Sequence, residues 1–114
     1  MANRISVNMS VKDVFNAKRA SQTVEAVIGK PIKISGFAVS ETVDAETGEV
    51  KEVGYIVEKD TGAVFGFVSD ICREALDDLN ELVTEDPAML KDLTIVFKKN
   101  KSKNGREFYY IQIL

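Results

Sequence analysis

A change in the spacing of apolar residues constrains the fold of this chain more than any other feature. After residue 30, apolar and polar residues alternate in five stretches, which predicts strands at residues 31–39, 53–57, 63–68, 93–97 and 108–113. Between the third and fourth stretches, apolar residues recur at helical spacing along one side, with charged residues on the other. This pattern predicts one amphipathic helix at residues 70–83, with Ser69 as its N-cap. The predicted order is three strands, one helix and two strands.

This order of elements predicts an OB-fold, an all-β fold class with one helix. In an OB-fold, five strands form a partly open Greek-key β-barrel, and the helix lies between the third and fourth strands. We expect the five strands of this chain to form a closed or nearly closed barrel. A β-sandwich would require more strands, and a ferredoxin-like fold would require alternating helices. Gly36 interrupts the first predicted strand, where a small barrel needs a bend or a bulge. Asn104-Gly105 predicts a tight turn between the last two strands.

Residues 1–30 lack this alternation and predict a short helical extension that packs on the barrel. Ser10 and Asp13 have the spacing of a capping box, with an aspartate in place of the usual Glu or Gln. Ser21 is placed to cap a second short helix that Gly29 would end. The 114 residues contain no internal repeat and no linker, so we expect one domain over residues 1–114.

The missing residue types exclude most kinds of catalytic site. With no histidine and one cysteine, the chain has no donor set typical of zinc and no Ser-His-Asp or Cys-His pair. It also has no Walker A loop and no GxGxxG motif. We therefore expect a protein that is not an enzyme and that binds no metal and no cofactor.

Targeting signals are not evident either. No run of about eighteen apolar residues occurs, and the first eight residues form no apolar signal core. The single cysteine, Cys72, cannot form a disulfide within the chain. Together these features predict a cytoplasmic protein without a membrane partner.

The charges are unevenly distributed along the chain. The net charge is −3, yet residues 1–40 carry six basic and two acidic groups, and residues 91–114 carry the same numbers. Residues 41–90 carry three basic and fourteen acidic groups. A protein with segregated charges can present a basic face to a polyanion while its acidic remainder repels other contacts. The alternative is that the clustered charges are only solvated surface.

Five cations and no acidic residue lie in residues 98–106, around the predicted turn. They are Lys98, Lys99, Lys101, Lys103 and Arg106. In an OB-fold, the loop between the last two strands is one of two that contact oligonucleotides. Cations on this hairpin can follow a phosphate backbone, and counterion release then supplies much of the affinity. The alternative is a solvated turn, because lysines also protect exposed strand ends from aggregation.

An aromatic strand follows the basic hairpin directly. Alternation places Phe108 and Tyr110 on one face and the more apolar set on the other, namely Tyr109, Ile111 and Ile113. We expect the more apolar set to face the core, so that Phe108 and Tyr110 stand outward beside the lysines and stack on bases. The alternative is that the two faces are reversed.

Other aromatic and acidic residues lie in the middle of the chain. Phe65 and Phe67 share one face of the third predicted strand and are candidates for a second base-stacking surface, although core packing is the favoured interpretation. Tyr55 alternates with apolar residues and is predicted to lie in the core. The loop from Glu41 to Glu49 is acidic and should repel phosphate, so we expect it to lie away from the nucleic-acid path.

Several segments together resemble a known family. They are Ala20-Ser21-Gln22, Gly29–Ile34, Asp44–Val50 and Lys99–Arg106, the last followed by the aromatic strand. In these segments the chain resembles the small single-stranded DNA-binding proteins of phages that replicate by protein priming. The resemblance implies that the protein coats displaced strands during replication, protects them from nucleases and unwinds secondary structure. It also implies action in the host cytoplasm.

We therefore expect a protein that binds single-stranded DNA without sequence preference, with a replication polymerase as a further candidate partner. We expect a monomer or a weak oligomer. One alternative is an OB-fold module that binds a protein, or inhibits a host protein, through the acidic side of its helix. A second alternative is a structural barrel within a larger assembly.

Overall fold

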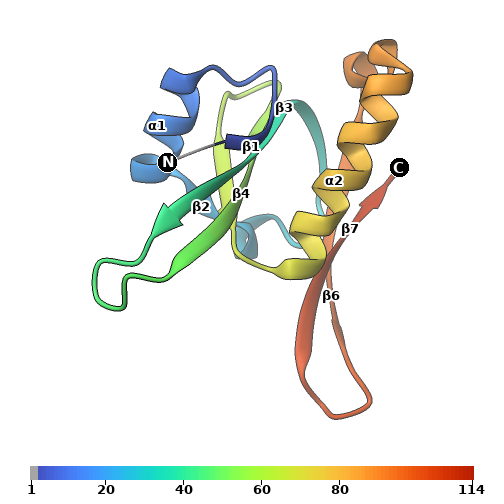
Figure 1. The fold of residues 1–114 in the computed structure, drawn as a ribbon. Helices are drawn as coiled ribbons and strands as arrows, with labels where there is room; N and C mark the ends of the chain where they lie inside the picture. The colour runs from blue at the N-terminus through green and yellow to red at the C-terminus, as the bar shows by residue number, and fades with distance from the viewer. Residues whose placement is uncertain (1–2) are drawn as a thin grey trace.

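A computed structural model describes residues 3–114 of the chain. Their elements, in order, are β1 (Asn3–Val7), α1 (Val11–Ala20), β2 (Gln22–Thr23), the 3-10 helix η1 (Val24–Val27), β3 (Pro31–Val43), β4 (Val50–Glu58), β5 (Val64–Phe67), α2 (Asp70–Glu85), the 3-10 helix η2 (Pro87–Asp92), β6 (Thr94–Lys101) and β7 (Glu107–Ile113). The fold is mostly β, and the strands form one curled, open sheet (Figure 1). The strand order is β2-β5-β4-β3-β6-β7, and β1 pairs with β3. This half-barrel is consistent with a barrel-like OB-type fold.

The long strand β3 joins the two parts of the curled sheet. Residues 34–43 pair with β4, whereas residues 31–33 pair with β6. The register with β4 shifts between Ile34 and Gly36, which confirms the irregularity expected at this glycine. A Cβ atom on Gly36 would lie 2.7 Å from the carbonyl oxygen of Val7, at the end of β1. Glycine therefore allows β1 to approach β3 where the sheet changes partners.

All five strands predicted from alternation are present, but the sheet differs from the prediction in two respects. First, β1 and β2 add two strands that the alternation did not predict. In β1, exposed Arg4 and Ser6 alternate with the more buried Ile5 and Val7, a short pattern that the sequence-based prediction missed, whereas β2 has only two residues and shows no pattern of its own. Second, the sheet is open, since no ladder within residues 3–114 joins β5 to β7.

The N-terminal extension begins as expected and then departs from the prediction. The capping box of α1 is confirmed: the Ser10 hydroxyl accepts from the Asp13 N–H at 3.1 Å, and the Asp13 carboxylate accepts from the Ser10 N–H at 2.9 Å. Ser21 does not cap a second α-helix. Its N–H donates to the Ala17 carbonyl at 3.0 Å and ends α1, while residues 24–27 form the 3-10 helix η1. The extension is therefore part strand and part helix.

Two apolar clusters hold these elements together. The larger one lies between α2 and the curled sheet, and α2 contributes Cys72, Leu76, Leu79 and Val83. The sheet contributes the fully buried Phe37, Ile95 and Phe97, among others. The smaller cluster joins α1 to the sheet and contains Met9, Val14, Ala17, Ala38 and Tyr55. Each large apolar side chain buried in this way stabilises the fold by about 1.5–3 kcal/mol.

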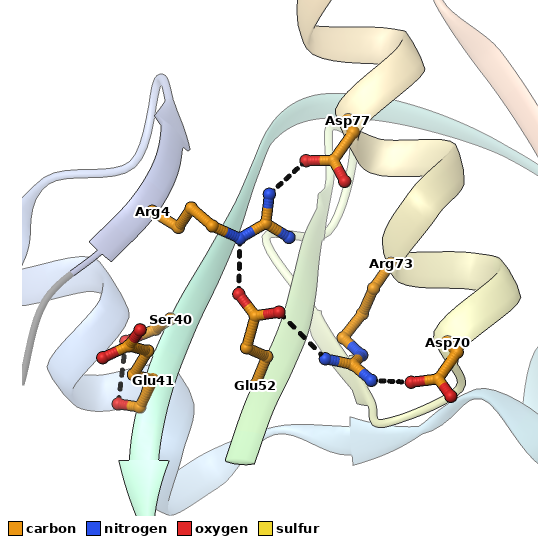
Figure 2. Close-up of polar contacts among 7 residues, drawn as sticks. All are labelled: Arg4, Ser40, Glu41, Glu52, Asp70, Arg73 and Asp77. Carbon is orange, nitrogen blue, oxygen red and sulfur yellow. Dashed lines mark hydrogen bonds and ion pairs between the residues drawn. The ribbon is translucent and has the colours of Figure 1, made fainter. Parts of the chain in front are cut away.

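An ion-pair network ties β1 and α2 to β4 (Figure 2). The Glu52 carboxylate accepts from Arg4 of β1 and, at 3.2 Å, from Arg73 of α2. Arg4 also contacts Asp77, and Arg73 also contacts Asp70 one turn earlier on α2. Part of the acidic charge on α2 is thereby neutralised within the molecule.

Candidate nucleic-acid interface

The β6–β7 hairpin projects from the body of the sheet and carries the basic segment (Figure 1). Gly105 adopts a φ of 78°, which glycine reaches without strain. Its N–H donates to the Ser102 carbonyl at 2.9 Å, and the Ser102 N–H donates to the Arg106 carbonyl at 2.8 Å. The turn predicted at Asn104-Gly105 is therefore confirmed, and the cations next to it, Lys101, Lys103 and Arg106, are exposed, whereas Lys98 is half-buried.

The five cations of the hairpin are not equivalent. Lys99 Nζ lies 3.0 Å from the Glu107 carboxylate and 3.6 Å from that of Glu25. It also lies 5.5 Å from the centre of the Tyr109 ring. The hydrogen bond to Glu107 is the main reason why the pKa of Lys99 is raised. The other four form no ion pair with described residues and are Lys98, Lys101, Lys103 and Arg106.

The aromatic residues of β7 lie beside these cations. Tyr110 pairs with Lys98 and Phe108 pairs with Asn100, so these four side chains share one face of the hairpin. The Phe108 and Tyr110 ring centres are 6.0 Å apart, with their planes inclined by 38°. Both side chains are half-buried. The buried Phe97 belongs to the opposite face. One face of the hairpin thus combines a cation with two accessible rings.

Phe65 and Phe67 lie in the core instead, so the sequence-based assignment of base stacking to them does not fit the structure. They are 3% and 7% exposed, respectively. The Phe67 ring packs edge-to-face on Phe97, with 5.4 Å between the ring centres. A buried ring offers no free face to a base, so core packing explains both residues. Tyr55 is buried as predicted, and burial raises its pKa.

A groove that the sequence did not predict lies where the sheet is open. It has a volume of about 410 Å³ and separates β7 from β5 and the β2–η1 segment. Its lining residues are Thr23, Val24, Glu25, Gly66, Phe67, Val68, Ser69, Glu107, Phe108 and Tyr109. The Tyr109 hydroxyl donates to Glu25 and so links η1 to β7 across the groove. We call this feature the seam groove.

The acidic loop lies apart from the basic hairpin. It connects β3 to β4, and the two hairpins project in different directions (Figure 1). Within it, the Asp44 carboxylate accepts from the Glu46 N–H at 2.8 Å and pairs with Lys51 at 3.1 Å. The position of this loop agrees with the expectation that it lies away from a path along the hairpin.

Other kinds of site find little support in the described part of the chain. Residues 3–114 contain no group of three or more acidic or cysteine side chains arranged to hold a metal ion. None of the helices in this range has the length and apolar character needed to cross a membrane.

The sequence profile of one protein family matches almost the whole chain. The family is described as phage single-stranded DNA-binding protein, and the match extends over residues 6–114. It therefore includes the basic hairpin, the aromatic strand and the seam groove. No curated protein and no solved structure is significantly similar to the chain.

Proposed function

Since the chain belongs to the family of phage single-stranded DNA-binding proteins, we propose that it coats single-stranded DNA without sequence preference during phage replication and protects it from nucleases. Because the family consists of DNA-binding proteins, we also regard this protein as a binding protein and not as an enzyme. The observation that supports the proposed mode of binding is the hairpin face on which Lys98 lies beside Phe108 and Tyr110.

Two interactions on this hairpin supply affinity without reading sequence. The four cations that form no ion pair with described residues attract phosphates. Each phosphate contact with single-stranded DNA contributes about 0.7 to the slope of log affinity against log salt. Phe108 and Tyr110 stack on bases, which contributes about 1–3 kcal/mol per base. Every base has an aromatic face and every nucleotide has a phosphate. Neither interaction therefore distinguishes one base from another.

We further propose that β3 to β7 and α2 form the five-stranded Greek-key arrangement of an OB-fold, with α2 between its third and fourth strands. Residues 1–114 would then form one domain, in which residues 1–30 are an extension packed on the sheet. A replication polymerase is a candidate partner, the host cytoplasm is the expected site of action, and a monomer or weak oligomer is the expected state.

The alternative in which the acidic side of α2 docks on a protein has less support. Asp70 and Asp77 on this helix already pair with arginines of the same chain. A partner would have to break these pairs or bind beside them.

Equilibrium binding to oligonucleotides of dT, dA and dC at several salt concentrations tests the proposal. We expect similar affinities for the three sequences, weaker binding to duplex DNA, and affinity that falls steeply as salt rises. Equal or tighter binding to the duplex, or strong preference for one sequence, would contradict it. A nuclease-protection assay with the same oligonucleotides tests coating.

A further inference from the structure

We propose that the seam groove receives one base of the bound strand. The phosphates on either side of that base would contact the basic hairpin. This inference rests on the proposed function and adds a second place at which the strand makes contact. The groove opens between β7 and β5, and Phe108 contributes to its lining whereas Tyr110 does not, so it extends beyond the face that holds this pair of rings.

The lining of the groove suits a planar, largely apolar group. Val68, Phe108 and Tyr109 supply apolar and aromatic atoms, and the buried Phe67 also belongs to the lining. Val68 is 64% exposed, so its side chain is accessible to a group that enters the groove. A volume of about 410 Å³ lies within the range of about 300–1,000 Å³ that is typical of small-ligand sites.

The charges at the rim indicate which part of a nucleotide enters. Glu25 and Glu107 both lie on the rim, and both pair with the single ammonium group of Lys99. Two carboxylates against one cation leave an excess of negative charge, which repels a phosphate and tolerates an uncharged base. The groove and the hairpin are therefore complementary to different parts of the same strand.

The positions of the cations place phosphates next to this opening. Arg106 directly precedes Glu107 in the chain, and Lys101 pairs with Glu107 across the hairpin. Neither cation forms an ion pair with described residues. A strand whose phosphates contact Lys101 and Arg106 would thus bring its next base to the rim of the groove.

The backbone of β7 provides polar contacts for the edge of such a base. Within the described sheet, β7 is an edge strand that pairs with β6 alone. The N–H and C=O groups on its other edge are therefore available at the groove, as on any unpaired strand edge. Backbone groups offer both donors and acceptors, so they tolerate different bases.

Substitution of Val68 tests the proposal, with Val50 as a matched control. Val50 is 63% exposed and lies at the start of β4, next to the acidic loop. Val68→Asp and Val50→Asp therefore add the same charge at equally exposed positions. Val68→Asn and Val50→Asn repeat the comparison without a change in charge. Each variant is measured against an ordinary oligonucleotide and one of equal length in which every base is replaced by an abasic site.

We expect Val68→Asp to weaken binding to the ordinary oligonucleotide about tenfold relative to Val50→Asp, with a smaller effect in the same direction for Val68→Asn. On the abasic oligonucleotide, the two asparagine variants should bind alike, whereas Val68→Asp should still repel the neighbouring phosphates. Equal weakening at the two positions on the ordinary strand, or a Val68→Asn defect that is equally large on the abasic strand, would overturn the seam groove as a base site. If the wild-type protein binds neither oligonucleotide, the proposed function itself fails.

Discussion

Lys99 and Glu107 lie on facing strands of the basic hairpin, and their charged groups approach to 3.0 Å. This ion pair distinguishes Lys99 from Lys101 and Lys103, which form no ion pair within the described chain. A lysine that already pairs with a carboxylate gains less from a phosphate, because the first pair must be broken. Lys101 and Lys103 therefore match phosphate contact better than Lys99 does.

We accordingly expect the double variant Lys101→Ala/Lys103→Ala to weaken binding for every single-stranded sequence. The slope of log affinity against log salt should become shallower by about 0.7 for each phosphate that the variant no longer neutralises. Lys99→Ala should change this slope less than either of the other two substitutions alone. Salt titrations of the purified variants with one oligonucleotide measure these differences.

The double variant Lys12→Ala/Lys91→Ala is the matched control, since it removes two exposed lysines from α1 and η2. It changes the net charge by the same amount but should leave the slope nearly unaltered. Thermal melts should show that each exposed substitution alters stability by no more than about 0.5 kcal/mol. Equal slope changes in the two double variants would indicate a general charge effect and remove the hairpin as the binding site.

For base stacking, we expect Tyr110→Ala to lower affinity by about 1–3 kcal/mol while the salt slope stays almost constant, because stacking releases no counterion. Tyr110→Phe should retain most of the affinity. Phe15→Ala is the control, since Phe15 is a 55% exposed aromatic residue on α1, where it packs under Arg19. A Tyr110→Ala protein that is folded and binds as tightly as the wild type would refute stacking on this ring.

The close approach of β1 to β3 gives a prediction about stability. Gly36→Ala should destabilise the fold by about 1–3 kcal/mol, because the added methyl group would meet backbone atoms of Val7 and Asn8 that cannot move independently. Urea denaturation followed by circular dichroism measures this change. Ser35→Ala, at the half-buried neighbouring position, should cost less. A Gly36→Ala protein as stable as the wild type would show that β1 can shift to accommodate the methyl group at little cost in free energy.

Features that depend on local spacing could be predicted from the sequence. Alternation depends only on neighbouring residues, and it correctly placed Phe108 and Tyr110 on the face opposite the core side of the hairpin. The helical stripe of α2 and the capping box at Ser10 are local in the same sense. For Phe65 and Phe67, alternation identified a shared face but not its direction, because the flanking Val64 and Val68 make the other face apolar as well.

Features that depend on distant segments could not be predicted in this way. Tyr109 and Glu25 are 84 positions apart, and nothing in the local pattern links them. Their contact, together with that between Lys99 and Glu25, requires η1 to lie against the hairpin. The seam groove follows from the same arrangement, since its walls come from three separate parts of the chain. A predicted fold class alone leaves such packing undetermined.

The acidic loop gives a prediction about pH. The pKa of Asp44 is lowered below the usual 3.8, chiefly because its carboxylate accepts the Glu46 N–H, and also because Lys51 lies nearby. A lowered pKa in the folded state means that the ionised carboxylate stabilises the fold above the usual pKa. This stabilisation disappears as the pH falls through the lower value of the folded state.

Asp44→Asn should therefore be less stable than the wild type near neutral pH, and the difference should shrink in acid, below pH 3.8. Urea denaturation of both proteins over this range measures the difference, and an NMR titration of the Asp44 carboxyl group should give a midpoint below 3.8. Glu49→Gln removes the same charge from the same loop, and within residues 3–114 the Glu49 carboxylate accepts no hydrogen bond. If Asp44→Asn and Glu49→Gln change the stability of the protein equally at every pH, only the net charge of the loop affects that stability. The hydrogen bonds of Asp44 would then contribute nothing to holding the β3–β4 turn.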